Sequence, residues 1–160
     1  LNKNFAAVLN AMSLIDDPDI VLVAAGGGNT RIFTDSAVQH ERLQRTGYVS
    51  DQQLRALYEG AACFVFPSFY EGFGLPPLEA MCCGCPVIVS DRASLPEVCA
   101  DAALYCNPDD PATLAAQLRR VLGSPALTDE LRTRGYQRAA QLTWDRAARE
   151  FAELMDLHFA

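Results

Sequence analysis

Two carboxylates frame a glycine-containing turn in the stretch P-S-F-Y-E-G-F-G-L-P-P-L-E, which spans residues 67–79. Glu71 precedes the turn, and Glu79 lies eight positions further along the chain. Gly72 and Gly74 allow unusual backbone torsions and a close approach to a ligand, and the proline pair presets the first turn of a helix. Backbone amides at such a helix N-terminus form a site for phosphate or for polar hydroxyl groups.

The amides of Phe73, Gly74 and Leu75 are the ones we expect to point out of this helix. Carboxylates repel phosphate, but they accept hydrogen bonds from hydroxyl groups. Amides between two carboxylates therefore suit a ligand with phosphates in its middle and polyols at both ends, which is the layout of a nucleotide-sugar. Taken alone, Glu71 fits a surface position and Glu79 a local cap or ion pair. The combination of strand, glycines and helix favours a ligand site.

The segments that must position this turn alternate between apolar strands and amphipathic helices. We expect strands at 20–24, 46–49, 62–66, 86–89 and 102–105, and helices at 2–15, 35–43 and 51–60, after Gly74, after Ser94 and from 111 onward. The continuous apolar runs at 20–24 and 62–66 predict burial on both faces. Such alternation predicts an α/β fold, in which a parallel sheet has helices on both faces and binds ligands at the carboxyl ends of its strands.

Several helices begin with a side chain that can cap them. Ser50 and Thr143 are N-cap candidates, and Asp110 precedes a proline at the first helical position. Ser94 and Glu97 form an S-x-x-E capping box, which we interpret as structural rather than as part of the site.

The composition fits one globular domain that comprises residues 1–160. Half of the residues are hydrophobic, which is enough for a buried core, and no apolar run approaches the ~18 residues of a membrane span. The net charge of −7 predicts no basic surface for nucleic acid and argues against docking on anionic lipid. One small phosphorylated molecule can still bind, because a few amides and one lysine suffice for it.

Six cysteines are present, and two of them, Cys82 and Cys85, form a C-x-x-C pair. A zinc site needs a second pair, and a redox pair should follow a strand and open a helix, whereas this one follows a helix and precedes a strand. We therefore expect no metal site and interpret the cysteines as small buried residues of a reduced, cytoplasmic protein.

The segments E-G-F-G-L-P-P-L-E-A-M, G-C-P-V-I-V-S and S-L-P-E-V resemble the donor-binding half of glycosyltransferase family 4. The resemblance extends from Lys3–Asn4 to the T-W pair of the last helix, and the Glu-x7-Glu segment is its most specific part. It implies a GT-B enzyme, in which two Rossmann-like domains face each other across a cleft. This chain would then be the C-terminal domain, which binds the nucleotide-sugar.

The resemblance implies a role for each matching side chain. Glu71 is expected to contact the transferred sugar and Glu79 the ribose hydroxyls. Lys3 is expected to neutralise the diphosphate leaving group, which is the main catalytic need. The alternative for Lys3 is a solvated residue at a helix start, where the helix dipole disfavours a cation. The backbone of Tyr48 and Val49 is expected to meet the base.

The backbone of the turn is expected to contact the sugar and the diphosphate through Gly72, Phe73, Gly74 and Leu75. In the family the loop at 26–28 borders the donor cleft, so Gly27 is a further candidate, although a tight turn after the strand explains it equally well. We find no Asp-x-Asp pair suited to hold a metal ion at a diphosphate, and the family requires neither metal nor cofactor.

Two parts of the family pattern are missing from the sequence. The donor domain of the family starts with one more strand, central in the sheet, and a loop with a Gly-Arg pair whose arginine binds the diphosphate. The acceptor-binding domain is missing as well. We therefore expect a domain that is incomplete at its N-terminus, that is partnered by the N-terminal acceptor domain of a longer protein, and that transfers no sugar alone.

The expected reaction of the full-length protein is the retaining transfer of a sugar from a nucleoside diphosphate to an acceptor hydroxyl, in cell-surface polysaccharide or glycolipid synthesis. GDP-mannose-type donors are favoured. Two alternatives stay open, a non-catalytic sugar-nucleotide-binding module and a GT-B epimerase. A phosphorylase would need a pyridoxal-binding lysine, and Lys3 is the only lysine. The sequence leaves the oligomeric state open.

Overall fold

The computed structural model describes residues 2–26 and 40–159, so Gly27 and most of the helix predicted at 35–43 lie outside the described residues. Helices and parallel strands alternate, and the predicted α/β class is confirmed. The elements are α1 (Phe5–Ser13), β1 (Leu22–Ala25), β2 (Leu43–Gly47), α2 (Asp51–Gly60), β3 (Phe64–Phe66), α3 (Leu75–Cys82), β4 (Val87–Ser90), α4 (Leu95–Cys99), the 3₁₀ turn η1 (Ala100–Ala102), β5 (Ala103–Cys106), α5 (Pro111–Gly123), α6 (Pro125–Gln141) and α7 (Trp144–Phe159).

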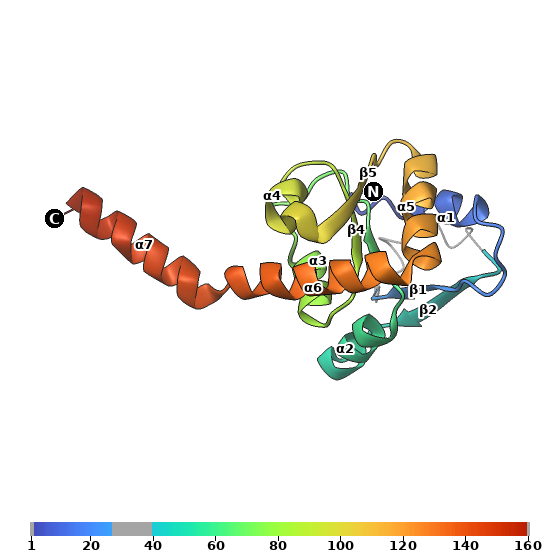
Figure 1. Ribbon diagram of the computed structural model, residues 1–160, viewed down its shortest axis with the longest axis horizontal. Helices are drawn as coiled ribbons and strands as arrows, with labels where there is room; N and C mark the ends of the chain where they lie inside the picture. Colours follow the sequence, from blue (N-terminus) through green and yellow to red (C-terminus); the bar gives the residue numbers. More distant parts are fainter. Residues whose placement is uncertain (1, 27–39, 160) are drawn as a thin grey trace.

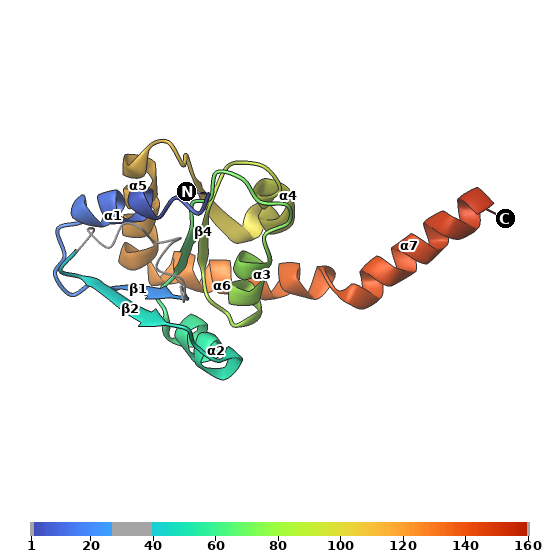
Figure 2. The same ribbon diagram turned by 180° about the vertical axis from the view of Figure 1, so that it is seen from behind.

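The described strands form two separate parallel sheets, β1 with β2, and β3-β4-β5 in that order (Figures 1 and 2). In the larger sheet Val87 of β4 lies between Phe64 of β3 and Ala103 of β5. Neither β1 nor β3 has a second neighbour among the described strands, so each presents one unpaired edge. The single sheet that the sequence predicts is therefore present in two pieces among the described residues.

The larger sheet has a packed core on each face. On β4, Val87 and Val89 belong to the core that α3, α4 and α6 complete, whereas Ile88 belongs to the core beside α1 and α5. All three side chains are fully buried. Figure 1 shows α1 and α5 side by side on one side of this sheet. Helices thus cover both faces, as continuous apolar strands require, and they fix the loops that leave the carboxyl ends of β3 and β4.

The smaller sheet departs from the predictions in two ways. Val21 and Val23 are 46% and 43% exposed, so β1 is covered on one face only, where Leu22 packs against the core beside α1 and α5. The second strand begins at Leu43 rather than at 46, because Leu43 pairs with Leu22. The apolar content of a segment does not reveal how many layers cover it or where its partner strand begins.

Three of the predicted helix caps are confirmed. Ser50 Oγ accepts a hydrogen bond from the Gln53 amide, and the Ser50 amide donates to Gln53 Oε1, which completes a capping box on α2. Asp110 and Thr143 accept hydrogen bonds from amides in the first turns of α5 and α7. These caps satisfy amides that a helix N-terminus otherwise leaves unpaired.

Replacement of Ser50 by alanine is expected to lower the free energy of unfolding by about 1 kcal/mol, because the hydroxyl that accepts the Gln53 amide is lost, whereas the backbone amide at position 50 is kept. Urea unfolding monitored by circular dichroism measures the change. The exposed Gln52 of the same helix provides the control, since Gln52→Ala removes no described contact and should stay within about 0.5 kcal/mol of the parent. Equal changes in the two variants would contradict the role of the cap.

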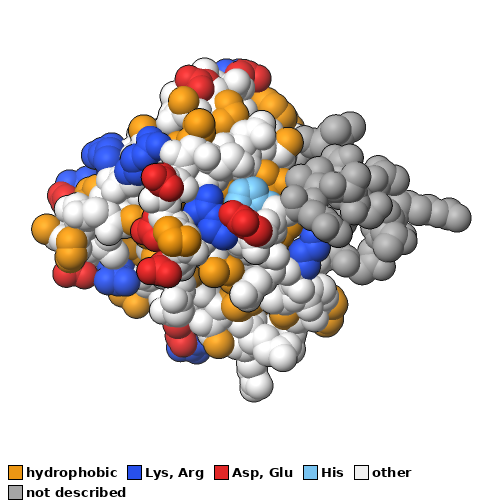
Figure 3. Space-filling model, turned by 90° about the vertical axis from the view of Figure 1, so that its right-hand side faces the viewer, with side chains coloured by type: hydrophobic (Ala, Val, Ile, Leu, Met, Phe, Trp, Pro, Cys, Tyr) orange, Lys and Arg blue, Asp and Glu red, His pale blue; other side chains and the backbone are white. Residues whose placement is uncertain are grey.

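Helix α7 extends away from both cores (Figures 1 and 2). Its apolar side chains Trp144, Phe151 and Leu157 are exposed. No helix among residues 2–26 and 40–159 combines the length and the hydropathy that a bilayer span needs. On the face shown in Figure 3, acidic and basic side chains are interspersed. That face therefore presents mixed charge rather than a field of one sign.

Candidate functional site

The N-terminal segment lies along the loop that follows β3, and this places Lys3 beside Glu71. Lys3 Nζ lies 2.6 Å from Glu71 Oε1, although the two residues are 68 positions apart. The Asn2 side chain donates a hydrogen bond to the Tyr70 carbonyl at 2.6 Å, and the Phe69 amide donates to the Asn2 carbonyl at 3.0 Å. The fold thus brings together the two side chains that the sequence analysis proposes as catalytic.

The Lys3–Glu71 pair is open to solvent on the lysine side. The side chain of Lys3 is 60% exposed and that of Glu71 is 14% exposed. Lys3 Nζ also lies 4.5 Å from the centre of the Phe66 ring, which attracts a cation to its face. An ion pair with so exposed a partner contributes at most about 1 kcal/mol. An anionic ligand can therefore draw the ammonium group away from Glu71 with little loss of stability.

The turn itself depends on Gly74, whose φ of 109° lies in the left-handed region that other residues avoid. A Cβ at this position would lie 2.7 Å from Cδ2 of Leu95. Gly72 differs from the prediction, because its φ lies outside that region and the space around it is open. Helix α3 begins directly after Gly74, with the proline pair in its first turn as predicted.

Ser94 precedes α4 and contacts the turn instead of capping its own helix. Its Oγ lies 2.9 Å from the Glu71 carbonyl and 2.8 Å from the Phe73 carbonyl. It makes no capping hydrogen bond within the described chain, so the predicted capping box with Glu97 is wrong. The cause is the backbone of Ser94, whose ψ of −15° is already helical, whereas Ser50 caps α2 with an extended ψ of 164°.

The two carbonyls that Ser94 engages determine the direction of two amides. In a trans peptide the C=O and the following N–H point in opposite directions, so the Gly72 and Gly74 amides point away from Ser94. Neither amide donates a hydrogen bond to any residue that the structure describes. Gly72 is exposed, so its amide is open to a ligand, whereas Gly74 is buried. The side chains of Phe73 and Leu75 are exposed beside them.

Glu79 lies exposed on α3, near Tyr58 of α2. Burial, assisted by the charge of Glu79, raises the pKa of Tyr58 to about 12. Among the described residues none makes a hydrogen bond or an ion pair with the Glu79 carboxylate, Lys3 and Glu71 included. Glu79 is thus available to a ligand, but it stands apart from the Lys3–Glu71 pair.

Tyr48 and Val49 line a groove between the end of β2 and the start of α2. The groove has a volume of about 390 Å³ and is completed by Thr46, Gln53, Ala56 and Leu57. The Tyr48 side chain is almost fully exposed, so its ring is available to a planar ligand. Within the described ranges no hydrogen bond or ion pair links this groove to the turn at 71–74.

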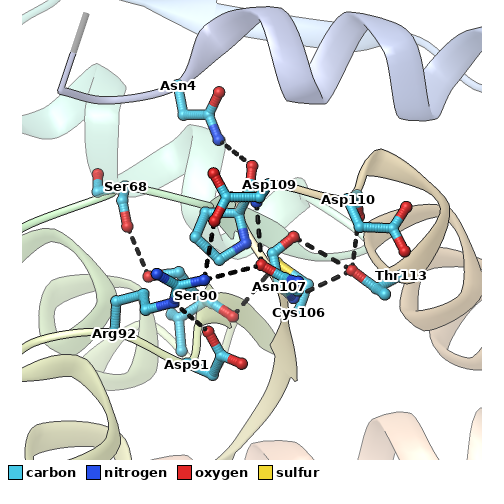
Figure 4. A network of polar contacts seen from close by, with 12 residues as sticks. Asn4, Ser68, Ser90, Asp91, Arg92, Cys106, Asn107, Asp109, Asp110 and Thr113 are labelled. Atoms are coloured by element: carbon cyan, nitrogen blue, oxygen red, sulfur yellow. Dashed lines mark hydrogen bonds and ion pairs between the residues drawn. The ribbon is translucent and has the colours of Figure 1, made fainter.

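A polar network that the sequence analysis missed joins the carboxyl ends of β3, β4 and β5 (Figure 4). Ser90 Oγ donates to the Ser68 carbonyl at 2.6 Å, and Arg92 donates to Asp109 Oδ2 at 2.8 Å and to Asn107 Oδ1 at 3.1 Å. Ser68 is fully buried, and its own hydroxyl has no partner among the described residues. These hydrogen bonds occupy the Arg92 side chain, so we assign it a structural role. Because the partners are distant in sequence and share no motif, no local signal reveals them.

Only three of the six cysteines are buried, while Cys63 and Cys83 are half-buried and Cys82 is exposed, which corrects the sequence interpretation in part. Burial raises the pKa of Cys85 and of Cys99 to about 11 and that of Cys106 to about 12, so these thiols stay protonated at neutral pH. In the part of the chain that the structure describes, no group of three His, Cys, Asp or Glu side chains is placed to hold a metal ion.

Comparison with known proteins identifies the family of the chain. The model of the family described as glycosyl transferases group 1 matches residues 1–139. The O-antigen chain mannosyltransferase B of Escherichia coli is 45% identical over 103 residues, which are 64% of this chain and 27% of that protein. The chain thus spans about a quarter of the length of this curated relative.

Solved structures show the same fold. Sucrose-phosphate synthase from Thermosynechococcus elongatus has a TM-score of 0.82 and 29% identity, covering 99% of this chain and 43% of that one. HepE from Anabaena, solved in complex with UDP and glucose, has a TM-score of 0.83 and 18% identity, covering 97% and 45%. These neighbours are GT-B glycosyltransferases, so the expected Rossmann-like fold is confirmed.

Proposed function

The chain belongs to the glycosyl transferases group 1 family, and on this basis we propose that it is the donor-binding half of a retaining glycosyltransferase of family 4. The full-length protein transfers a sugar from a nucleoside diphosphate to an acceptor hydroxyl, which an N-terminal domain binds. The 45% identity with an O-antigen mannosyltransferase supports mannose as the sugar, GDP-mannose as the donor and a cell-surface polysaccharide as the product. The cysteines are free rather than joined in disulfides, which fits a cytoplasmic location.

The observation that carries this proposal is the Lys3–Glu71 ion pair beside two amides that donate to none of the described residues. A nucleoside-diphosphate sugar needs a cation and amides for its diphosphate, and acceptors for the hydroxyls at both ends. Lys3 with the Gly72 and Gly74 amides suits the diphosphate, and Glu71 suits the sugar. Glu79 is assigned to the ribose. The groove beside Tyr48 is assigned to the base.

In this proposal, one set of groups acts on the diphosphate side of the bond that breaks, and Glu71 acts on the sugar side. As the bond from the anomeric carbon to the diphosphate oxygen lengthens, negative charge grows on the diphosphate and positive charge on the sugar. Lys3 and the turn amides stabilise the negative charge on the diphosphate, and Glu71 stabilises the positive charge on the sugar. In each case the fold holds the stabilising group in place before the reaction. The acceptor hydroxyl oxygen forms the new bond to the anomeric carbon, and its proton passes to the departing diphosphate. No cofactor enters this scheme.

Calorimetric titration of the chain with UDP, GDP, ADP, UDP-glucose and GDP-mannose tests the proposal. We expect saturable binding of one base, and a loss of at least about 10-fold in affinity in Glu79→Ala, because a carboxylate that accepts hydrogen bonds from two hydroxyls is removed. Glu153→Ala, which removes an exposed carboxylate of α7, is the matched control. Failure of both the chain and the full-length protein to bind any of the five compounds would contradict the proposal.

A further inference from the structure

We propose that Ser94 is a positioning residue for the sugar and diphosphate contacts of the turn, which it holds through its hydroxyl from a different element of the fold. The identity of the ligand rests on the proposed function, whereas the contacts are features of the fold. The hydroxyl shares its one proton between two acceptors in a bifurcated hydrogen bond, the Glu71 carbonyl at 2.9 Å and the Phe73 carbonyl at 2.8 Å. One side chain therefore fixes two peptide planes in a turn that supplies few hydrogen bonds of its own.

Those two planes determine what the turn offers to a ligand. With both carbonyls directed at Ser94, the Gly72 and Gly74 amides point to the opposite side, where no described residue uses them. The same constraint sets the backbone from which the Glu71 side chain reaches Lys3 Nζ at 2.6 Å. Without the hydroxyl each carbonyl is free to turn toward water, and both amides lose their common direction.

Ser94 can act as an anchor because α4 is itself held in place. Arg138 of α6 donates to the Val98 carbonyl at 2.8 Å and to the Glu97 carbonyl at 2.7 Å, at the C-terminal end of α4. Leu95, the residue after Ser94, is fully buried and fills the space beside Gly74. The hydroxyl is therefore presented from a part of the core and not from a loose loop.

The backbone just before α4 adopts a locally unfavourable conformation, and this conformation orients Ser94 toward the turn. Ala93 has a φ of 53°, in the left-handed region that alanine rarely adopts. This bend gives Ser94 its helical dihedrals, so its side chain crosses to the turn and does not cap α4. Ala93 thus has a strained backbone, and the adjacent Ser94 leaves α4 without a side-chain cap. Strained backbone conformations cluster at functional sites.

Backbone nitrogen-15 relaxation of Gly72, Phe73 and Gly74 tests the positioning role without any ligand. In Ser94→Ala we expect their order parameters to fall from about 0.85 to below about 0.6, while those of α4 stay unchanged. Ser94→Thr keeps a hydroxyl and should keep the parent values. Glu97→Ala is the matched control, because a capping box would make both of its members matter equally. Unchanged order parameters in Ser94→Ala, or an equal loss in Glu97→Ala, would overturn the proposal.

Titration of the same variants with GDP-mannose and GMP measures the consequence for binding. We expect Ser94→Ala to weaken GDP-mannose binding by about 3- to 10-fold, the effect of one hydrogen bond, and to leave GMP binding unchanged. Ser94→Thr should restore GDP-mannose binding. Equal weakening for both compounds would overturn the assignment to the sugar and diphosphate. If neither the chain nor the full-length protein binds either compound, the assignment of GDP-mannose as donor fails, and the relaxation experiment still decides whether Ser94 holds the turn.

Discussion

Glu71→Gln in the full-length protein is expected to lower sugar transfer by about 100- to 1000-fold, the effect of removing one preorganised charge that faces the reacting atoms. The amide has the size of the carboxylate but carries no charge, so it cannot stabilise positive charge on the sugar. The Glu71 side chain is only 14% exposed, so little bulk water reaches the site to take its place. Initial rates with GDP-mannose and a polysaccharide acceptor measure the loss.

The same variant should behave differently toward the nucleotide alone. Glu71 holds Lys3 at 2.6 Å in the unliganded protein, and its negative charge opposes an incoming diphosphate. In Glu71→Gln the ammonium group is released and the repulsion is gone, so GDP should bind as tightly as to the parent or more tightly. Glu97→Gln, an exposed carboxylate on α4, is the control and should change neither rate nor affinity. Full transfer activity in Glu71→Gln would refute the catalytic role of this residue.

The sequence predicts those features that depend on neighbours within a few positions. Apart from the helix expected at 35–43, the order of helices and strands follows from local residue types, as do the N-cap at Ser50 and the torsion of Gly74, and the structure shows each of them. The S-x-x-E pattern at Ser94 and Glu97 is equally local, but it fails. The left-handed turn at Ala93 rotates Ser94 into helical dihedrals, and contacts distant in sequence then take its hydroxyl.

Local sequence patterns do not predict features that depend on contacts between residues distant in the sequence. The Lys3–Glu71 contact joins residues 68 positions apart, and only the resemblance to a known family indicates that both belong to one site. The exposed face of β1 and the separation of the two sheets depend on which strands pair with each other. An apolar run such as 20–24 has the same sequence pattern whether its strand is covered on one face or on both. Burial of a polar residue such as Ser68 is likewise a property of the assembled sheet.

Gly74→Ala is expected to lower the free energy of unfolding by about 2–4 kcal/mol and to abolish nucleotide-sugar binding. A φ of 109° is strained for alanine, and the new Cβ would lie 2.7 Å from a methyl group of Leu95, which is fully buried and has little room to move. Relief of either conflict changes the turn, and with it the direction of the Gly74 amide. Urea unfolding measures the loss of stability, and calorimetry measures the loss of binding.

Gly72→Ala provides a control of opposite sign within the same turn. Its φ suits alanine and no atom lies within 4 Å of the added Cβ, so stability should stay the same or rise by up to about 1 kcal/mol through the lower entropy of the unfolded chain. Leu95→Val in combination with Gly74→Ala then separates the two causes. If the clash dominates, the second substitution is less damaging in the Gly74→Ala background than in the parent. Purely additive losses would instead assign the whole effect to the backbone torsion, and similar losses for Gly72→Ala and Gly74→Ala would contradict the geometry of the turn.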